Sequence, residues 1–283
     1  PVGINTDLGT PHNPWAVTHR APGGSSSGSA VAVAAGLAVT ALGSDTGGSV
    51  RIPAALCGIV GLKTTVGRVS RAGAYPLSWL LDSVGPLARS VEDAALTYAA
   101  IQGPDDADDS THGVAPADVL GGLRAGVRGL RLVVCESLVF DGAHPDVVQA
   151  IAAAAEVLKG LGATVERRRV PEVEETGADA DRLLLSPAEA CHINAQYLDH
   201  QFEALDPVVR TRMISGRQLL APAYVGALRR MAERRRRLLD TLRDVDALLA
   251  PTVPVPAEPV ADMATPDAYQ RLAPKYSRNT SLG

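Results

Sequence analysis

The chain has 283 residues, a hydrophobic content of 46% and a formal net charge of −4. This length and hydrophobicity suffice for a large core, and the nearly balanced charge gives no indication of binding to nucleic acid or acidic lipid. Three cysteines, Cys57, Cys135 and Cys191, are too few and too scattered for a disulfide framework and form no CxxC pair for zinc, so we expect a reducing, cytoplasmic setting. No membrane segment is expected, because the apolar stretch 30–42 is shorter than the roughly 20 residues that span a bilayer.

The first third of the chain predicts helices and strands around a polar loop. Residues 1–20 are rich in turn formers and show no clear periodicity. The small residues of 28–36 predict a helix, 37–42 a buried strand and 59–63 a second strand. Ser90, followed by acidic residues at positions 92 and 93, is typical of a helix N-cap, so we expect a helix from there to about residue 102.

The rest of the chain alternates strands with helices and places the protein in the α/β class. A strand, a helix and a strand within some forty residues predict a βαβ crossover and hence a parallel pair. The expected elements are a strand at 130–134, a helix at 145–160, a strand at 163–170, long helices at 181–204 and 222–243, and a strand at 247–252.

Two polar clusters in this part have ordinary explanations. The sequence RRMAERRRR (229–237) is compatible with RNA contact, but it falls on the polar side of an amphipathic helix, and we favour a solvated face. Cys191 and His192, together with His200, are weak candidates for metal ligands, and packing is favoured over a metal site.

The stretch GGSSSGSA (23–30) gains significance from a second Gly-Gly-Ser in DTGGSVRIP (45–53). Alone, the first stretch is compatible with a flexible linker or an anion-binding nest. The Walker pattern and the GxSxG nucleophile elbow are both absent, and no histidine has an obvious catalytic setting. A helix and a returning strand separate the two stretches, so the fold can bring their serines together.

The second stretch has the features of an oxyanion-binding loop. Gly47 and Gly48 allow the backbone to approach a ligand closely and to direct its N–H groups into one concavity. Asp45 before the glycines and Arg51 after them are expected to hold the loop by hydrogen bonds, and Pro53 is placed near a helix start.

These motifs resemble the signature of the amidase signature family. The match extends from GGSSSGSA through GSDTGGSVRIPAALCGIVGLK, and NPW (13–15), GRVSRAG (67–73), LDSVGPLARSVEDAA (81–95) and APTVPVPA (250–257) also fit. It is dense over 13–103 and thin over 104–245; Thr64 and Thr65 depart from the family's more usual Pro-Thr. The resemblance implies one amidase signature domain over 1–283, with a mixed central sheet flanked by helices on both faces, incomplete at both ends.

The resemblance also assigns roles to individual residues. Ser49 matches the acyl-forming nucleophile, and Ser25 matches a bridging serine that follows a cis peptide bond. The backbone of Thr46, Gly47 and Gly48 matches the oxyanion hole. The residues implied to support the site are Gly24, Ser26, Asp45 and Arg51. No metal or organic cofactor is implied.

The base that the family uses has no counterpart in this sequence. In the family a buried, neutral lysine ahead of the bridging serine takes the proton of the nucleophile, because a serine hydroxyl needs an adjacent base. No lysine precedes Ser25, and Lys63, Lys159 and Lys275 do not match. We expect a fragment that lacks the base, in preference to an inactive relative.

Three functions follow from the resemblance. The first is a stand-alone amidase that cleaves a small-molecule amide. The second is the glutaminase component of a tRNA-dependent amidotransferase, whose relatives usually carry adjacent tyrosines where this chain has only Tyr224. The third is an inactive relative that binds amides. Tyr75 and Trp79 are compatible equally with the substrate pocket and with the core, and the sequence leaves a homodimer open.

Overall fold

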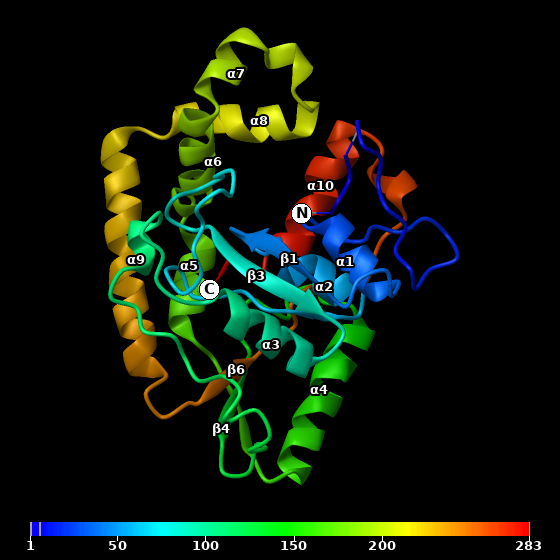
Figure 1. The fold of residues 1–283 in the computed structure, drawn as a ribbon, viewed down its shortest axis with the longest axis vertical. Helices are drawn as coiled ribbons and strands as arrows, with labels where there is room; N and C mark the ends of the chain where they lie inside the picture. The colour runs from blue at the N-terminus through cyan, green and yellow to red at the C-terminus, as the bar shows by residue number, and fades with distance from the viewer. Residues whose placement is uncertain (1, 6, 283) are drawn as a thin grey trace.

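The computed structural model describes residues 2–5 and 7–282, and Figure 1 shows its helices packed around two groups of strands. Its helices and strands confirm the predicted α/β class. In chain order they are α1 (Ser27–Ala34), β1 (Thr40–Asp45), α2 (Arg51–Leu56), β2 (Val60–Gly61), β3 (Ser83–Ala88), α3 (Val91–Ile101), β4 (Arg131–Cys135), α4 (Pro145–Gly160), β5 (Thr164–Arg168), α5 (Pro171–Ala178), α6 (Arg182–Ile193), α7 (Ala195–His200), α8 (Pro207–Ser215), α9 (Ala221–Thr241), β6 (Ala247–Leu249) and α10 (Pro266–Ser277). Short 3-10 helices lie at Asp109–Thr111, Phe202–Ala204, Gly216–Gln218 and Val260–Met263.

The strands divide between two three-stranded sheets. One has the order β1–β3–β2 with antiparallel pairing, and the other has the order β5–β4–β6 with parallel pairing. The parallel pair of β4 and β5, joined by α4, is the predicted crossover, and α4 begins and ends where the sequence predicts. The family resemblance implies one mixed central sheet, whereas the described strands form separate antiparallel and parallel sheets because no ladder joins β1, β2 or β3 to the others.

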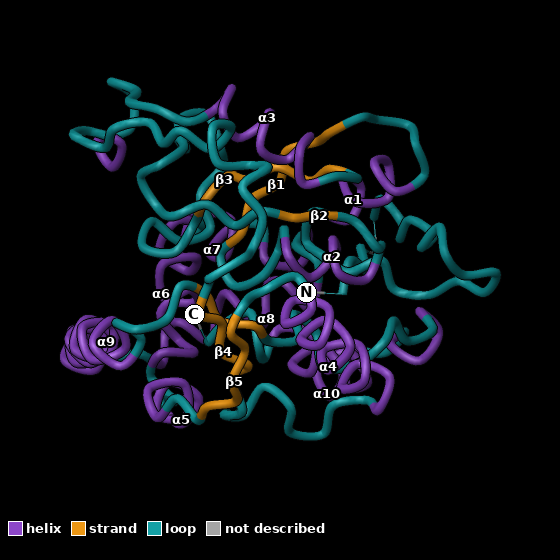
Figure 2. Tube along the Cα trace, turned by 90° about the horizontal axis from the view of Figure 1, so that it is seen from below, coloured by secondary structure: helices purple, strands orange, loops and turns teal. Residues whose placement is uncertain are grey.

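Helices cover both faces of the antiparallel sheet. Figure 2 shows α3 on one side of it and α2 on the other. Side chains alternate between the faces along a strand, so Thr40 and Leu87 point in opposite directions. Thr40 meets Thr97 of α3 through a hydroxyl hydrogen bond, whereas Leu87 packs with Ala30 of α1 and Ala54 of α2 in a small buried cluster.

Strand β3 is missing from the sequence prediction because Gly85 and Pro86 lie within it. Pro86 cannot donate to a ladder, but its carbonyl oxygen accepts the Leu62 N–H at 3.0 Å beside β2. A Cβ on Gly85 would collide with the Leu62 backbone oxygen, so only glycine allows this close approach. The turn-forming residues therefore serve the packing of the strands.

The structure corrects two further predictions. The stretch 37–42 is not a buried strand, because β1 begins at Thr40 and the Leu37 and Leu42 side chains are 81% and 48% exposed. The helix predicted over 181–204 is interrupted at Asn194, which ends α6 and precedes α7. No helix within residues 2–5 and 7–282 is long and apolar enough to cross a membrane.

The basic run on α9 is only partly a solvated face. Arg230 and Arg234 form ion pairs with Asp179 at the end of α5, and Arg237 pairs with Glu175 of α5. Arg234 is buried. The predicted solvated face is therefore wrong for Arg234, because α5 presents carboxylates that only tertiary packing brings to α9.

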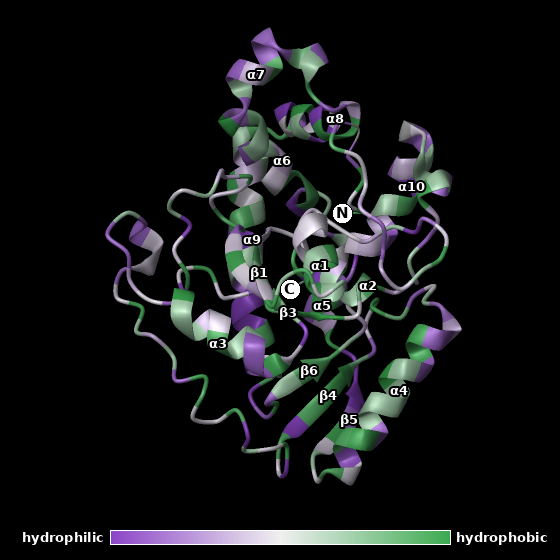
Figure 3. Ribbon diagram, turned by 45° about the vertical axis from the view of Figure 1, so that its right-hand side comes forward, coloured by the Kyte–Doolittle hydropathy of each residue, from purple (hydrophilic) through white to green (hydrophobic). Residues whose placement is uncertain are grey.

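The parallel sheet has the more apolar centre. Figure 3 shows β4 as a mainly hydrophobic strand between β5 and β6, with α4 beside the sheet. Leu132, Val133 and Val134 of β4 are buried. Near its C-terminal end, Cys135 packs with Val139 in a second cluster, which Leu282 also contacts. The C-terminal segment of the described chain is thus attached to this part of the molecule.

Candidate active site

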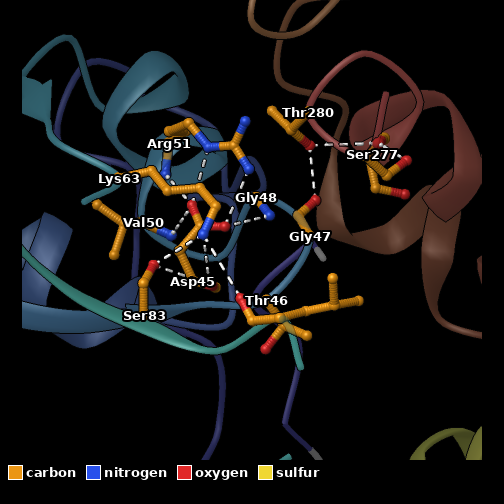
Figure 4. A network of polar contacts seen from close by, with 12 residues as sticks. Asp45, Thr46, Gly47, Gly48, Val50, Arg51, Lys63, Ser83, Ser277 and Thr280 are labelled. Atoms are coloured by element: carbon orange, nitrogen blue, oxygen red, sulfur yellow. Dashed lines mark hydrogen bonds and ion pairs between the residues drawn. The ribbon is translucent and has the colours of Figure 1, made fainter. Parts of the chain in front are cut away.

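The loop of residues 45–51, called the cradle loop below, is organised by the buried carboxylate of Asp45. One oxygen of that carboxylate accepts the Gly48 N–H at 2.7 Å, and the other accepts the Val50 N–H at 3.2 Å. Arg51 adds two side-chain hydrogen bonds to it, from Nε and Nη2, each at 3.0 Å (Figure 4). Asp45 and Arg51 therefore pin the loop as the sequence predicts, with Asp45 at its centre.

The charges around Asp45 keep it ionised. Burial acts to raise the pKa of the Asp45 carboxyl, but the Arg51 hydrogen bond, the Arg51 and Lys63 charges and the Gly48 N–H together lower that pKa below its usual value. The carboxylate is thus a permanent acceptor at neutral pH, and the backbone of the cradle loop folds around it.

Several N–H groups of the cradle loop have no acceptor. Among the described residues, no oxygen accepts the backbone N–H of Thr46, Gly47 or Ser49, whereas Gly48 donates to Asp45. Groups of this kind are available to an oxygen of a ligand. The Gly48 N–H, which the resemblance assigns to the oxyanion hole, instead donates to Asp45 and holds the loop. Gly48 contributes to the shape of the loop through its backbone conformation.

Only glycine fits at position 48. Its φ is +128°, a region that residues with side chains rarely adopt. A Cβ there would also lie 2.7 Å from Ile52 Cδ1 and closer still to Thr280 Oγ1. At Gly47, by contrast, the nearest atom to such a Cβ is Ser281 Cβ at 3.9 Å. The two glycines thus differ: position 48 requires glycine, and position 47 has room.

The two Gly-Gly-Ser stretches lie side by side. The Ser26 N–H donates to the Ser49 carbonyl oxygen at 3.2 Å, which joins the first stretch to the cradle loop. The peptide bond between Gly24 and Ser25 is cis, as the resemblance implies. Ser25 is exposed and Ser49 half-buried. Neither hydroxyl is hydrogen-bonded to a residue that the structure describes, so both are free to meet a ligand or a base.

Glycine is also required just before Ser25. A Cβ on Gly24 would lie 2.6 Å from the backbone nitrogen of Gly3. The chain at Ser25 is therefore packed directly against the N-terminal segment.

Two other serines of GGSSSGSA, Ser26 and Ser29, hold the start of α1 against the open edge of β1. The Ser29 hydroxyl donates to the Leu42 carbonyl at 2.9 Å, and the Ser26 hydroxyl lies 3.5 Å from the Ser44 carbonyl. These contacts satisfy edge groups of β1. The serine run is therefore a structural anchor around one candidate catalytic residue.

Lys63 lies behind the cradle loop. Its ammonium donates to Ser83 Oγ at 2.8 Å and to the Asp45 carbonyl at 3.3 Å. Burial lowers the pKa of this ammonium; the Arg51 charge acts in the same direction and the charges of Asp45 and Asp82 oppose it. These contacts agree with the structural role that its place in the sequence suggests. Lys159 pairs with Glu156 on the exposed side of α4.

Asp82 connects the cradle loop to residues 77–82, a contact that the sequence does not reveal. Its carboxylate accepts a short hydrogen bond from the Thr46 hydroxyl and the N–H groups of Leu77 and Ser78, at 2.8 and 2.9 Å. The side chain of Thr46 is thus held in place at the edge of the cradle.

Tyr75 and Trp79 are exposed, which excludes the prediction of core aromatics. The Tyr75 hydroxyl donates to Asn194 at 3.0 Å, and the Trp79 ring stands edge-on to the His192 ring with centroids 5.7 Å apart. These contacts tie residues 75–79 to the end of α6.

A buried carboxylate on α6 strengthens the same connection. Glu189 accepts hydrogen bonds from the hydroxyls of Ser78 and, at 3.0 Å, of Tyr224 on α9. The segment beside the cradle loop is therefore anchored to α6 and, through Glu189, to α9.

The last residues of the described chain also reach the cradle loop. The Thr280 hydroxyl donates to the Gly47 carbonyl at 2.7 Å. In Figure 4, Thr280 lies on the opposite side of Gly47 and Gly48 from Asp45. The contact joins residues 233 positions apart. No local pattern in the sequence signals it, since SRNTSLG has the composition of an ordinary loop.

The described residues contain no group of three or more His, Cys, Asp or Glu arranged to hold a metal ion. Cys57, Cys135 and Cys191 are all free and buried. The Ser49 hydroxyl and the acceptor-free N–H groups beside it can support the capture of an electrophilic carbon.

Comparison with known proteins identifies the family. The family model described as "Amidase" matches residues 2–277. The chain is 41% identical to the 2-amino-5-chloromuconic acid deaminase of Comamonas testosteroni, over 99% of this chain and 59% of that protein. It is 37% identical to a component of the glutamyl-tRNA(Gln) amidotransferase of Acidobacterium capsulatum, over 98% of this chain and 63% of that one.

Comparison of the fold with solved structures identifies the same family. The native peptide amidase of Stenotrophomonas maltophilia superposes with a TM-score of 0.76 at 32% identity, covering 99% of this chain and 61% of that one. The chain thus spans about three fifths of the length of the relatives named here. It belongs to the amidase family.

Proposed function

We propose that the protein hydrolyses a carboxylic amide through a serine acyl-enzyme, with 1–283 forming a single amidase signature domain. The observation that carries the proposal is the set of acceptor-free N–H groups at Thr46, Gly47 and Ser49, next to a free Ser49 hydroxyl and the backbone of Ser25–Ser26. Membership of the amidase family and similarity to a deaminase and a peptide amidase support it.

In the proposed reaction the Ser49 hydroxyl attacks the carbonyl carbon of the amide. The negative charge that develops on the substrate oxygen is stabilised by the free N–H groups of the cradle loop. Ser25 relays the Ser49 proton towards a base and then to the leaving amine, and water releases the acid. The base that the resemblance implies is a lysine ahead of the bridging serine, and no lysine of this sequence stands in such a position.

The test compares three single-serine variants of the complete protein against aliphatic amides, aryl amides and glutamine. Ser49→Ala should lower kcat/KM by roughly 10⁴-fold or more, because nucleophile removal leaves only binding and oxyanion stabilisation. Ser25→Ala should cause a large loss as well. Ser29→Ala is the matched control, since Ser29 belongs to the same serine run but bonds to β1. Circular dichroism checks the fold.

The outcomes separate the candidate functions. Near-normal turnover by Ser49→Ala would refute the assignment of the nucleophile. Activity on glutamine alone, with co-purifying partner chains, would favour the glutaminase component of an amidotransferase, for which the similarity to the Acidobacterium capsulatum protein is the supporting observation. Amide binding without turnover by the wild-type protein would favour the inactive relative.

The cellular setting is a secondary part of the proposal. We propose a cytoplasmic enzyme, supported by three unpaired cysteines. A homodimer stays a prediction.

A further inference from the structure

We propose that Thr280 is a positioning residue for the oxyanion-binding N–H groups of the cradle loop. This inference rests on the proposed function and extends it to a residue that none of the sequence motifs contains. Thr280 acts through the peptide group between Gly47 and Gly48 and does not touch the substrate.

The geometry of Thr280 fits a fixed hydrogen-bond donor. The residue is 4% exposed, so water does not compete for its hydroxyl. Its Oγ1 lies 2.7 Å from the Gly47 carbonyl oxygen and 3.2 Å from that of Ser277. A hydroxyl has one proton to donate, and the shorter contact assigns it to Gly47.

The peptide group between Gly47 and Gly48 is held at both ends. Its carbonyl oxygen accepts from Thr280, and its N–H donates to the Asp45 carboxylate at 2.7 Å. Figure 4 shows Thr280 and Asp45 on opposite sides of the two glycines. Because a peptide unit is planar and rigid, two such bonds fix its orientation. Asp45 alone would fix one end only.

This peptide group separates two of the acceptor-free donors. The Gly47 N–H precedes it and the Ser49 N–H follows it, and glycine is the residue whose backbone varies most freely. Rotation of this unit would therefore move both donors relative to the Ser49 hydroxyl. Stabilisation of an oxyanion requires donors that are already in place before the charge develops.

The position of Thr280 is also set by contacts of its neighbours outside the cradle loop. Asn279 next to it donates from Nδ2 to the carbonyls of Val139 and Pro251, at 2.9 and 2.8 Å. Arg182 of α6 donates to the Ser281 carbonyl. Val139 packs with Cys135 of β4, so the Asn279 contacts link Thr280 and the cradle loop to the parallel sheet.

The test uses Thr280→Val, which removes the hydroxyl at nearly constant size, and Thr280→Ser, which retains it, in the complete protein. We expect Thr280→Val to lower kcat by about 10- to 100-fold with KM almost unchanged, because misplaced donors weaken stabilisation of the transition state. Thr280→Ser should recover most of the loss. Thr111→Val is the control, since Thr111 is also buried and donates to loop carbonyls outside the cradle.

A second measurement does not depend on turnover. The backbone amide signals of Gly47, Gly48 and Ser49, followed by NMR, should shift in Thr280→Val and return towards wild type in Thr280→Ser. Unchanged signals and unchanged kcat in Thr280→Val would overturn the inference while leaving the proposed function intact. Shifted signals in a protein whose wild type hydrolyses no amide would show that the link to Gly47 exists and that the proposed function is wrong. An equal kcat loss in Thr280→Ser and Thr280→Val would also overturn it.

Discussion

The two sheet regions of the molecule use their charged residues in different ways. In the region of the antiparallel sheet, the Asp45–Arg51 pair has side chains that are 0% and 24% exposed, and it folds the cradle loop around itself. In the region of the parallel sheet, the Arg131–Asp246 pair has side chains that are 54% and 35% exposed and joins β4 to the segment before β6. A buried carboxylate surrounded by donors determines backbone shape, whereas an exposed pair adds little.

The same contrast applies to the distribution of function. The antiparallel region supplies both candidate catalytic serines and the free N–H groups from residues that are close in sequence. The parallel region supplies supports: Thr280 reaches the Gly47 carbonyl, and Glu189 holds Ser78 beside Asp82. We therefore expect substitutions in the first region to affect the chemistry directly and those in the second to act through the cradle loop.

The comparison predicts the largest effect for Asp45→Asn. Removing the charge leaves Arg51 without its ionic partner. The NH2 group of the new amide, which is a donor, would also face backbone N–H groups that are donors themselves, so the free energy of unfolding should fall by about 3–5 kcal/mol. Urea unfolding measures it. Asp246→Asn is the matched control and should leave the stability almost unchanged, because its pair is exposed. Equal losses in the two variants would remove the distinction between the regions.

The next effect concerns the two glycines of the cradle loop. Gly48→Ala should lower the free energy of unfolding by about 2–4 kcal/mol, since φ is unfavourable and Cβ collides with Thr280 and Ile52. Gly47→Ala should cost far less stability, because its Cβ meets nothing closer than 3.9 Å. Thermal unfolding of both variants provides the measurement. A larger loss at Gly47 would contradict the described packing.

Much of the antiparallel region was predictable from sequence because its decisive contacts are local. The bonds from Gly48 and Arg51 to Asp45 span at most six positions, so DTGGSVR contains both partners of each of these bonds. The N-cap at Ser90 and the limits of α4 follow equally from local rules. Family resemblance added the cis peptide bond at Ser25, which no periodicity indicates.

The remaining features could not be predicted because they depend on tertiary packing. Strand β3 is masked by Gly85 and Pro86, whose turn-forming character is overridden by pairing with β1 and β2. The contact of Thr46 with Asp82 joins residues 36 positions apart, and that of Thr280 with Gly47 joins residues 233 apart. Burial of Arg234 depends on where α5 packs. In each case the residue types are common and only their juxtaposition is informative.

The smallest predicted effect is the acid dependence of the same Asp45 contribution. Because the folded state holds the pKa of Asp45 below its unfolded value, the ionised carboxylate stabilises the fold fully above the unfolded pKa of about 4, and this contribution disappears as the pH falls through the folded pKa. The difference in free energy of unfolding between wild type and Asp45→Asn should therefore be constant between about pH 5 and 7 and shrink below about pH 4. Other carboxyl groups titrate in both proteins and cancel in the difference, which urea unfolding at several pH values provides. A difference that widens on acidification would mean that Asp45 is protonated in the fold, and the cradle loop would then need another organiser.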